Sequence, residues 1–149
     1  MMKFTLMFVV AVLMGAVSTH AQPETLCQVS KSSRLAMDQR DDQRLQCLKQ
    51  KAAQINVDQC LAIAASFEYS NNAEEARLVC LYDLKKVKVS FSECRKIAAS
   101  MEYPDSGDDV RWECLSRFNK KITKSQCQHI AKRMSYPANE ERAGVFCQQ

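Results

Sequence analysis

The chain has 149 residues, 46% of them hydrophobic, and a formal net charge of +4. This length favours one ordinary domain, and so mild a charge gives no support for a nucleic-acid-binding protein. The eight cysteines are an even number, which in an exported protein favours disulfide bonds in an oxidising compartment.

The first 21 residues have the pattern of a secretory signal peptide. Lys3 precedes an apolar run over residues 4–17, and the small residues that follow end at Ala21. The run is shorter than the ~20 apolar residues of a membrane span, so a retained anchor is the less favoured alternative. No second apolar run follows. We therefore expect cleavage after Ala21 and a soluble, secreted or periplasmic protein.

The cysteines of residues 22–149 divide the chain into four repeats. They stand at positions 27, 47, 60, 80, 94, 114, 127 and 147, so steps of 20 residues alternate with steps of 13 or 14. A period of 33 to 34 residues is typical of stacked helical hairpins. We predict an all-α fold, a short solenoid of four helix-turn-helix hairpins, with units at about 22–54, 55–88, 89–121 and 122–149.

The first unit lacks residues that the others share and is expected to act as an end cap, as is the short last unit. In the other three units the first helix should open with a capping box, in which two side chains bind otherwise unpaired backbone N–H groups. The cap residues are followed three positions later by Gln or Glu: Asn56 with Gln59, Ser90 with Glu93, and Thr123 with Gln126.

Each first helix is expected to bury a cysteine, an isoleucine and an alanine at helical spacing. Pro104 and Pro137 should end it, and the second helix should begin near Asn72, Ser106 and Asn139. The second helix is predicted to bury the second cysteine of the unit together with the residue two positions before it. The tyrosines of the turn are expected to pack between hairpins. These positions are Leu45, Leu78, Trp112 and Val145, and Tyr69, Tyr103 and Tyr136.

Hairpin geometry predicts the disulfide pairing. The turn lies midway between the two cysteines of a unit, so both sulfurs fall at the same height on facing helices, within disulfide reach. The predicted bonds are Cys27–Cys47, Cys60–Cys80, Cys94–Cys114 and Cys127–Cys147. The alternative pairs cysteines across the unit junctions, Cys47–Cys60, Cys80–Cys94 and Cys114–Cys127, and leaves two cysteines unpaired.

This architecture resembles tetratricopeptide-like αα repeats, especially their disulfide-bridged, cysteine-rich secreted members. The resemblance covers all four units and rests on the period, the helix pairing and the cysteine positions; the tetratricopeptide Trp, Leu-Gly and Tyr signature is absent. It implies binding through a solenoid surface and transfers no functional residue.

The sequence shows little support for an enzyme. His129 is the one histidine after residue 21, and every cysteine has a predicted partner. The cysteine spacings fit neither a structural zinc site nor a redox motif. We therefore expect no metal, no cofactor and no catalytic residue.

Charges separate along each unit. The hairpin turns are acidic and the junctions between units are basic, which places the two signs on opposite edges of the stack; helix dipoles alone can account for this. The acids are Asp38, Asp41, Asp42, Glu68, Glu74, Glu75, Glu102, Asp105, Asp108, Asp109, Glu140 and Glu141, and the lysines are Lys49, Lys51, Lys85, Lys86, Lys88, Lys120, Lys121 and Lys124.

Candidate binding residues lie where the first helices differ between units while their neighbours repeat. They are Leu61, Arg95, Lys96, Gln128, His129, Lys132 and Arg133. The expected function is a non-enzymatic binding module whose partner is a protein or an anionic envelope polymer, without nucleic acid and without a membrane span. The alternatives are a small cell-envelope hydrolase or hydrolase inhibitor, and a purely structural secreted protein.

Overall fold

The computed structural model describes residues 26–84 and 88–148, and the predicted signal peptide lies outside these ranges. The described residues form helices and no strand, which confirms the all-α fold class. The helices are α1 (Met37–Lys51), α2 (Val57–Ala64), α3 (Ser70–Tyr82), α4 (Phe91–Ser100), α5 (Pro104–Phe118), α6 (Lys124–Ala131) and α7 (Pro137–Phe146). Among them we find no helix with both the length and the apolar character needed to cross a membrane.

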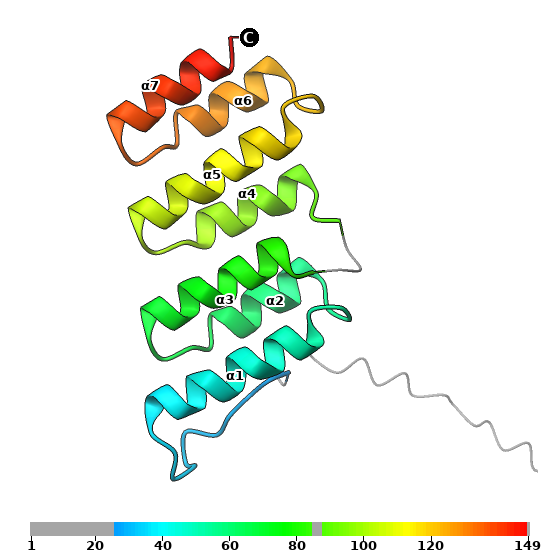
Figure 1. The fold of residues 1–149 in the computed structure, drawn as a ribbon, viewed down its shortest axis with the longest axis vertical. Helices are drawn as coiled ribbons and strands as arrows, with labels where there is room; N and C mark the ends of the chain where they lie inside the picture. The colour runs from blue at the N-terminus through cyan, green and yellow to red at the C-terminus, as the bar shows by residue number, and fades with distance from the viewer. Residues whose placement is uncertain (1–25, 85–87, 149) are drawn as a thin grey trace, which may run out of the picture.

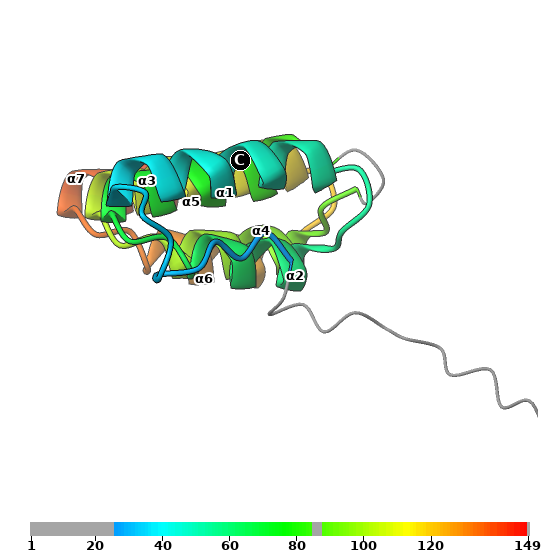
Figure 2. The ribbon, with the colours of Figure 1, turned by 90° about the horizontal axis from the view of Figure 1, so that it is seen from below.

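The helices stack as hairpins in two layers. Figure 1 shows the pairs α2–α3, α4–α5 and α6–α7 following one another along the long axis, with the hairpin turns on one side and the unit junctions on the other. Figure 2 shows α2, α4 and α6 in one layer and α1, α3, α5 and α7 in the other. Helices from different units therefore lie side by side in each layer, so neighbouring units contribute to common surfaces.

The capping boxes form as predicted. The Asn56 and Ser90 side chains accept the backbone N–H groups of Gln59 at 2.9 Å and Glu93 at 3.3 Å, and Thr123 has the same role in α6. The Gln and Glu side chains bind the cap backbone in return. These bonds fix where α2, α4 and α6 begin, because they satisfy N–H groups that have no partner within the helix.

The second helices begin two residues earlier than expected. α3, α5 and α7 start directly after the tyrosines of the turn, at Ser70, Pro104 and Pro137. The two prolines occupy the first helical position, where the missing N–H costs nothing and the fixed φ already suits a helix. Proline therefore begins the second helix of these units. The prediction that it ends the first helix was wrong, because α4 and α6 end at Ser100 and Ala131, several residues earlier.

All four predicted disulfides are present, and each joins the two halves of one unit. The paired Cα atoms lie between 5.5 and 5.8 Å apart, and no free cysteine remains. In the second and third units, the repeated Ile and Ala of the first helix and a leucine of the second helix lie around the bond. In the third unit these are Ile97, Ala98 and Leu115, all at most 4% exposed.

The first unit differs from the other three because its first half is not helical. Residues 26–36 form turns and bends, and Figure 2 shows them running along the layer of α2, α4 and α6. Ser30 binds the hydroxyl and the backbone N–H of Ser32, a local hydrogen-bond pattern that competes with helix formation. The Cys27–Cys47 bond attaches this segment to α1.

The residues two positions before the second cysteines are not a buried stripe. Leu78 and Val145 are 36% and 57% exposed, and Leu45 and Trp112 are half-buried. Trp112 packs edge-on against Phe146 and beneath the Arg142 guanidinium. The prediction was wrong because these positions face away from the other layer, while the leucine after the second cysteine in the first three units, such as Leu115, faces the core.

Candidate functional site

A repeated polar contact joins each unit to the next, and we call it the clasp. It consists of a buried acid six residues before the second cysteine, an arginine three residues after that acid, and the turn of the following unit. In the first clasp, Asp41 accepts the backbone N–H groups of Glu68 and Tyr69, each at 3.0 Å. Arg44 donates to the same carboxylate at 2.7 Å. The acid thus holds the next turn and places negative charge near the start of α3, where the helix dipole favours it.

The same arrangement recurs at both later junctions. Glu74 accepts the backbone N–H groups of Glu102 and Tyr103 and pairs with Arg77. In the third clasp, Asp108 accepts the N–H of Ser135 at 2.7 Å and the N–H of Tyr136 at 3.3 Å, and pairs with Arg111 at 2.9 Å. The two aspartates also accept a bond from an asparagine side chain of the next unit, Asn72 or Asn139.

The clasp environment favours the ionised form of the two aspartates and of Glu68. Burial by itself would raise the pKa of Asp41, but hydrogen bonds from the backbone of Tyr69 and Glu68 and from two side chains lower it below its ordinary value. The pKa of Asp108 is lowered in the same way. The hydrogen bond from Arg40 is the main cause that lowers the pKa of Glu68 from 4.5 to about 2.

The clasps change the interpretation of the acidic edge. Asp41 and Asp108 are 1% exposed and Glu74 is 6% exposed, so these three acids bind their own chain and are not available to a partner. The tyrosines contribute their backbone N–H groups, while their side chains stay 42–43% exposed and do not fill the space between hairpins as expected. On the opposite edge, Lys85 and Lys86 lie outside the described residues.

A groove of about 280 Å³ lies between α4 and α6, with α5 as its floor. Framework residues of the repeat form part of its wall, including Ala98, the Cys114 sulfur and Ile130. The remaining wall is basic, because Arg95, Lys96, Arg111 and Arg133 line the groove and no carboxylate does. The groove is therefore a concave surface that combines apolar contact with positive charge.

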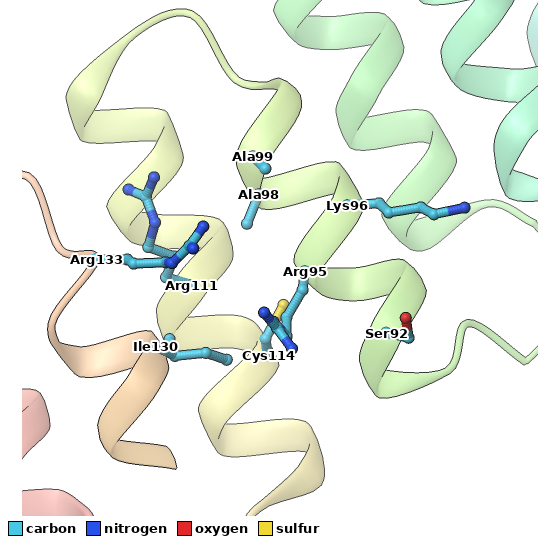
Figure 3. A pocket seen from close by; sticks show the side chains of 9 residues that line it. All are labelled: Ser92, Arg95, Lys96, Ala98, Ala99, Arg111, Cys114, Ile130 and Arg133. Atoms are coloured by element: carbon cyan, nitrogen blue, oxygen red, sulfur yellow. The ribbon is translucent and has the colours of Figure 1, made fainter. Parts of the chain in front are cut away.

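The basic side chains differ in how they are held. Figure 3 shows Arg95 and Arg133 reaching over α5 and Lys96 pointing away from it. Lys96 is paired with Asp58 of the preceding unit at 2.8 Å, whereas Arg95 lies over the Phe91 ring. Among the described residues, Arg133 makes no ion pair. Arg95 and Arg133 are therefore the cations best placed to bind an anion.

The corresponding surface one repeat earlier is not basic. The positions of Arg95 and Arg133 are taken there by Leu61 and Ser100, and Leu61 packs against the core. The alanines, the disulfide and the clasp arginine are the same in both places. Lys96 and Ser92 also correspond to different residues there, Ala62 and Asp58, so substitutions at four lining positions convert that surface into a basic groove on an unchanged framework.

The remaining predicted binding residues do not belong to this groove. Gln128 and Lys132 line a separate shallow surface between α6 and α7, together with Glu140 and Glu141. His129 is exposed on α6. The structure thus brings together three of the seven candidates, Arg95, Lys96 and Arg133, and leaves Leu61, Gln128, His129 and Lys132 apart from them.

Sequence reasoning missed Arg111 as a groove residue. Its position is occupied by arginine in three units, so it does not vary as the predicted binding residues do, and its contact with the groove depends on α4 and α6 of two different units. The acid three residues before each of these arginines was the available signal for the clasp.

Comparison with known proteins adds no assignment. No protein-family model matches the chain, and no curated protein or solved structure is significantly similar to it. Within residues 26–84 and 88–148, no three His, Cys, Asp or Glu side chains are arranged so that they could hold a metal ion.

Replacement of a clasp acid should destabilise the fold. Asp108→Asn leaves Arg111 without its buried partner and turns an amide toward the Ser135 N–H, so we expect the free energy of unfolding to fall by about 3 kcal/mol. Asp109→Asn removes an exposed charge from the same helix and should have little effect. Urea denaturation of both oxidised variants measures the difference, and equal stabilities would contradict a structural role for Asp108.

The stability of the fold should also depend on pH. The pKa values of Asp41, Asp108 and Glu68 are lower in the folded chain than in the unfolded one, so the unfolded state binds protons more readily. The stabilisation is complete above about pH 4.5 and disappears as the pH falls toward about 2. Thermal unfolding of the oxidised protein should show a constant Tm near neutrality and a falling Tm across that window. A Tm that stays constant down to about pH 2 would show that the pKa values of these acids are not lowered on folding.

Proposed function

We propose that the protein is a secreted or periplasmic, non-enzymatic binding module that recognises an anionic partner through the groove between α4 and α6. The observation that carries the proposal is the convergence of Arg95, Arg111 and Arg133 on one concavity without a lining carboxylate. Guanidinium groups suit this task because they present several donors in a fixed plane and remain charged.

The disulfides support the compartment. Four bonds and no free cysteine suggest an oxidising, extracellular environment. The signal-peptide pattern of residues 1–21 supports export to such an environment.

The hydrolase alternative has no comparable arrangement in its favour. His129 is exposed on α6, and every cysteine is held in a disulfide. A purely structural role provides no reason for two variable positions to become arginine beside a clasp arginine. The binding module is therefore the function that the geometry supports best.

Charge reversal in the groove should abolish binding. We expect Arg95→Glu with Arg133→Glu to weaken the binding of fluorescent poly-L-glutamate at least tenfold, because two attractive contacts become repulsive. Raising the salt should weaken wild-type binding as well, since exposed charges are screened over ~10 Å at 0.1 M. Fluorescence anisotropy of the oxidised protein measures both effects.

The matched control changes the same charge elsewhere. Lys120→Glu with Lys121→Glu alters the net charge by the same amount at exposed positions of the basic edge, and it should leave binding within about threefold. Equal losses in the two double variants would mean that net charge, and not the groove, attracts the polymer. Unchanged binding in the arginine double variant would exclude the groove.

A further inference from the structure

The third clasp lacks one acid that the other two possess. We propose that Arg111, together with Arg95 and Arg133, binds a carboxylate side chain of an acidic peptide in the place that a glutamate of the protein occupies in the other clasps. This inference rests on the proposed function and names the ligand class of the same groove.

The first two clasps show how the arginine is neutralised. Arg44 pairs with Asp41 at 2.7 Å and also with Glu68 of the next turn at 3.0 Å. Arg77 pairs weakly with Glu74 at 3.5 Å and closely with Glu102 of the next turn at 2.7 Å. In both cases a glutamate directly before the turn tyrosine supplies a second carboxylate.

The third clasp has Ser135 at this glutamate position. Its hydroxyl meets Arg111 at 3.3 Å and brings no charge. The Arg111 side chain is accordingly 19% exposed, whereas those of Arg44 and Arg77 are 4% and 9% exposed. Arg111 therefore presents donors to the groove that its counterparts use inside the fold.

The third clasp and its surroundings also carry more positive charge than the first two clasps. The first clasp has two arginines, Arg40 and Arg44, against two acids, and the second has one arginine against two acids. The third has one acid, Asp108, paired with Arg111, while Arg95 and Arg133 line the same groove. The loss of an acid and the gain of two cations thus occur at one junction.

The position of Arg111 is determined by the packing around it. A Cβ atom added to Gly107 would lie 3.0 Å from Nη1 of Arg111, so the glycine allows the guanidinium to lie close to the helix. The equivalent residue one repeat earlier is Ala73. The same Nη1 atom donates a hydrogen bond to Asp108. This bond orients the Arg111 guanidinium before any ligand binds.

The dimensions and the repeat itself indicate the occupant. A volume of about 280 Å³ is below the usual range for drug-sized ligands, and it suits one or two side chains of an extended chain. The two filled positions hold a glutamate side chain one residue before the tyrosine that caps the next helix. An acidic peptide supplies this same carboxylate side chain.

The first test restores the missing acid. Ser135→Glu should occupy the position beside Arg111, weaken the binding of a hexaglutamate peptide at least tenfold, and raise the Tm. The control is Ser116→Glu, which adds the same charge at an exposed position of α5 that does not line the groove. It should reduce binding no more than about threefold. Isothermal calorimetry on the oxidised proteins measures both affinities.

The second test builds the site one repeat earlier. Asp58→Ser, Leu61→Arg, Ser100→Arg and Glu102→Ser together should create a second hexaglutamate site, so that the stoichiometry rises from one peptide per chain to two. The matched variant with the first three substitutions but with Glu102 retained should keep one site, because Arg77 stays neutralised.

The outcomes separate the two proposals. Equal losses in Ser135→Glu and Ser116→Glu, or two sites in the variant that retains Glu102, would overturn the carboxylate position, while the basic groove is tested separately by the arginine double variant. Tighter binding of a hexagalacturonate or a hexaphosphate than of hexaglutamate would overturn the peptide assignment. Full hexaglutamate binding by the Arg95→Glu and Arg133→Glu double variant would reject the proposed function itself.

Discussion

The stack depends on a buried acid that reaches from one hairpin to the turn of the next. Its carboxylate accepts two backbone N–H groups and an arginine, as Asp108 does with Ser135, Tyr136 and Arg111. An ionised group can be buried in this way only because hydrogen bonds and an opposite charge compensate for its lost hydration. The clasp therefore fixes which residues of neighbouring units lie together, and the basic groove is one result of that register.

Disulfides and clasps stabilise different levels of the fold. Each disulfide joins the two halves of one unit, and closing a loop of about 20 residues contributes on the order of 3 kcal/mol, mainly through the unfolded chain. Such a bond cannot position one unit on another. That role belongs to the clasps and to the shared core, and the pattern stops in the fourth unit, where Glu141 is exposed and Gly144 takes the arginine position.

Much of the hairpin architecture was predictable because its signals are local. The 20-residue cysteine spacing indicates the pairing, and the capping boxes at Asn56, Ser90 and Thr123 fix helix starts through contacts only three residues long. The first unit was harder, because a cysteine at the right spacing suggested a helix that its serine-rich segment does not form.

The clasps and the groove were not predicted because they depend on contacts between units. An acid near the start of a helix already has a sufficient local explanation in the helix dipole, so Asp41, Glu74 and Asp108 looked like surface charges. Their burial follows from a contact about 27 residues away. Arg111 was missed for the same reason, since its exposure depends on whether the next turn carries glutamate or serine.

Native-state hydrogen exchange at the turn tyrosines tests the central claim most directly. The backbone N–H groups of Tyr69 and Tyr136 lie in turns beside exposed side chains, yet the clasps predict that they exchange slowly in the oxidised protein. Asp41→Asn should speed exchange at Tyr69 by roughly 100-fold and affect Tyr136 much less. Fast exchange at both positions in the wild-type protein, or no change on the substitution, would contradict the account.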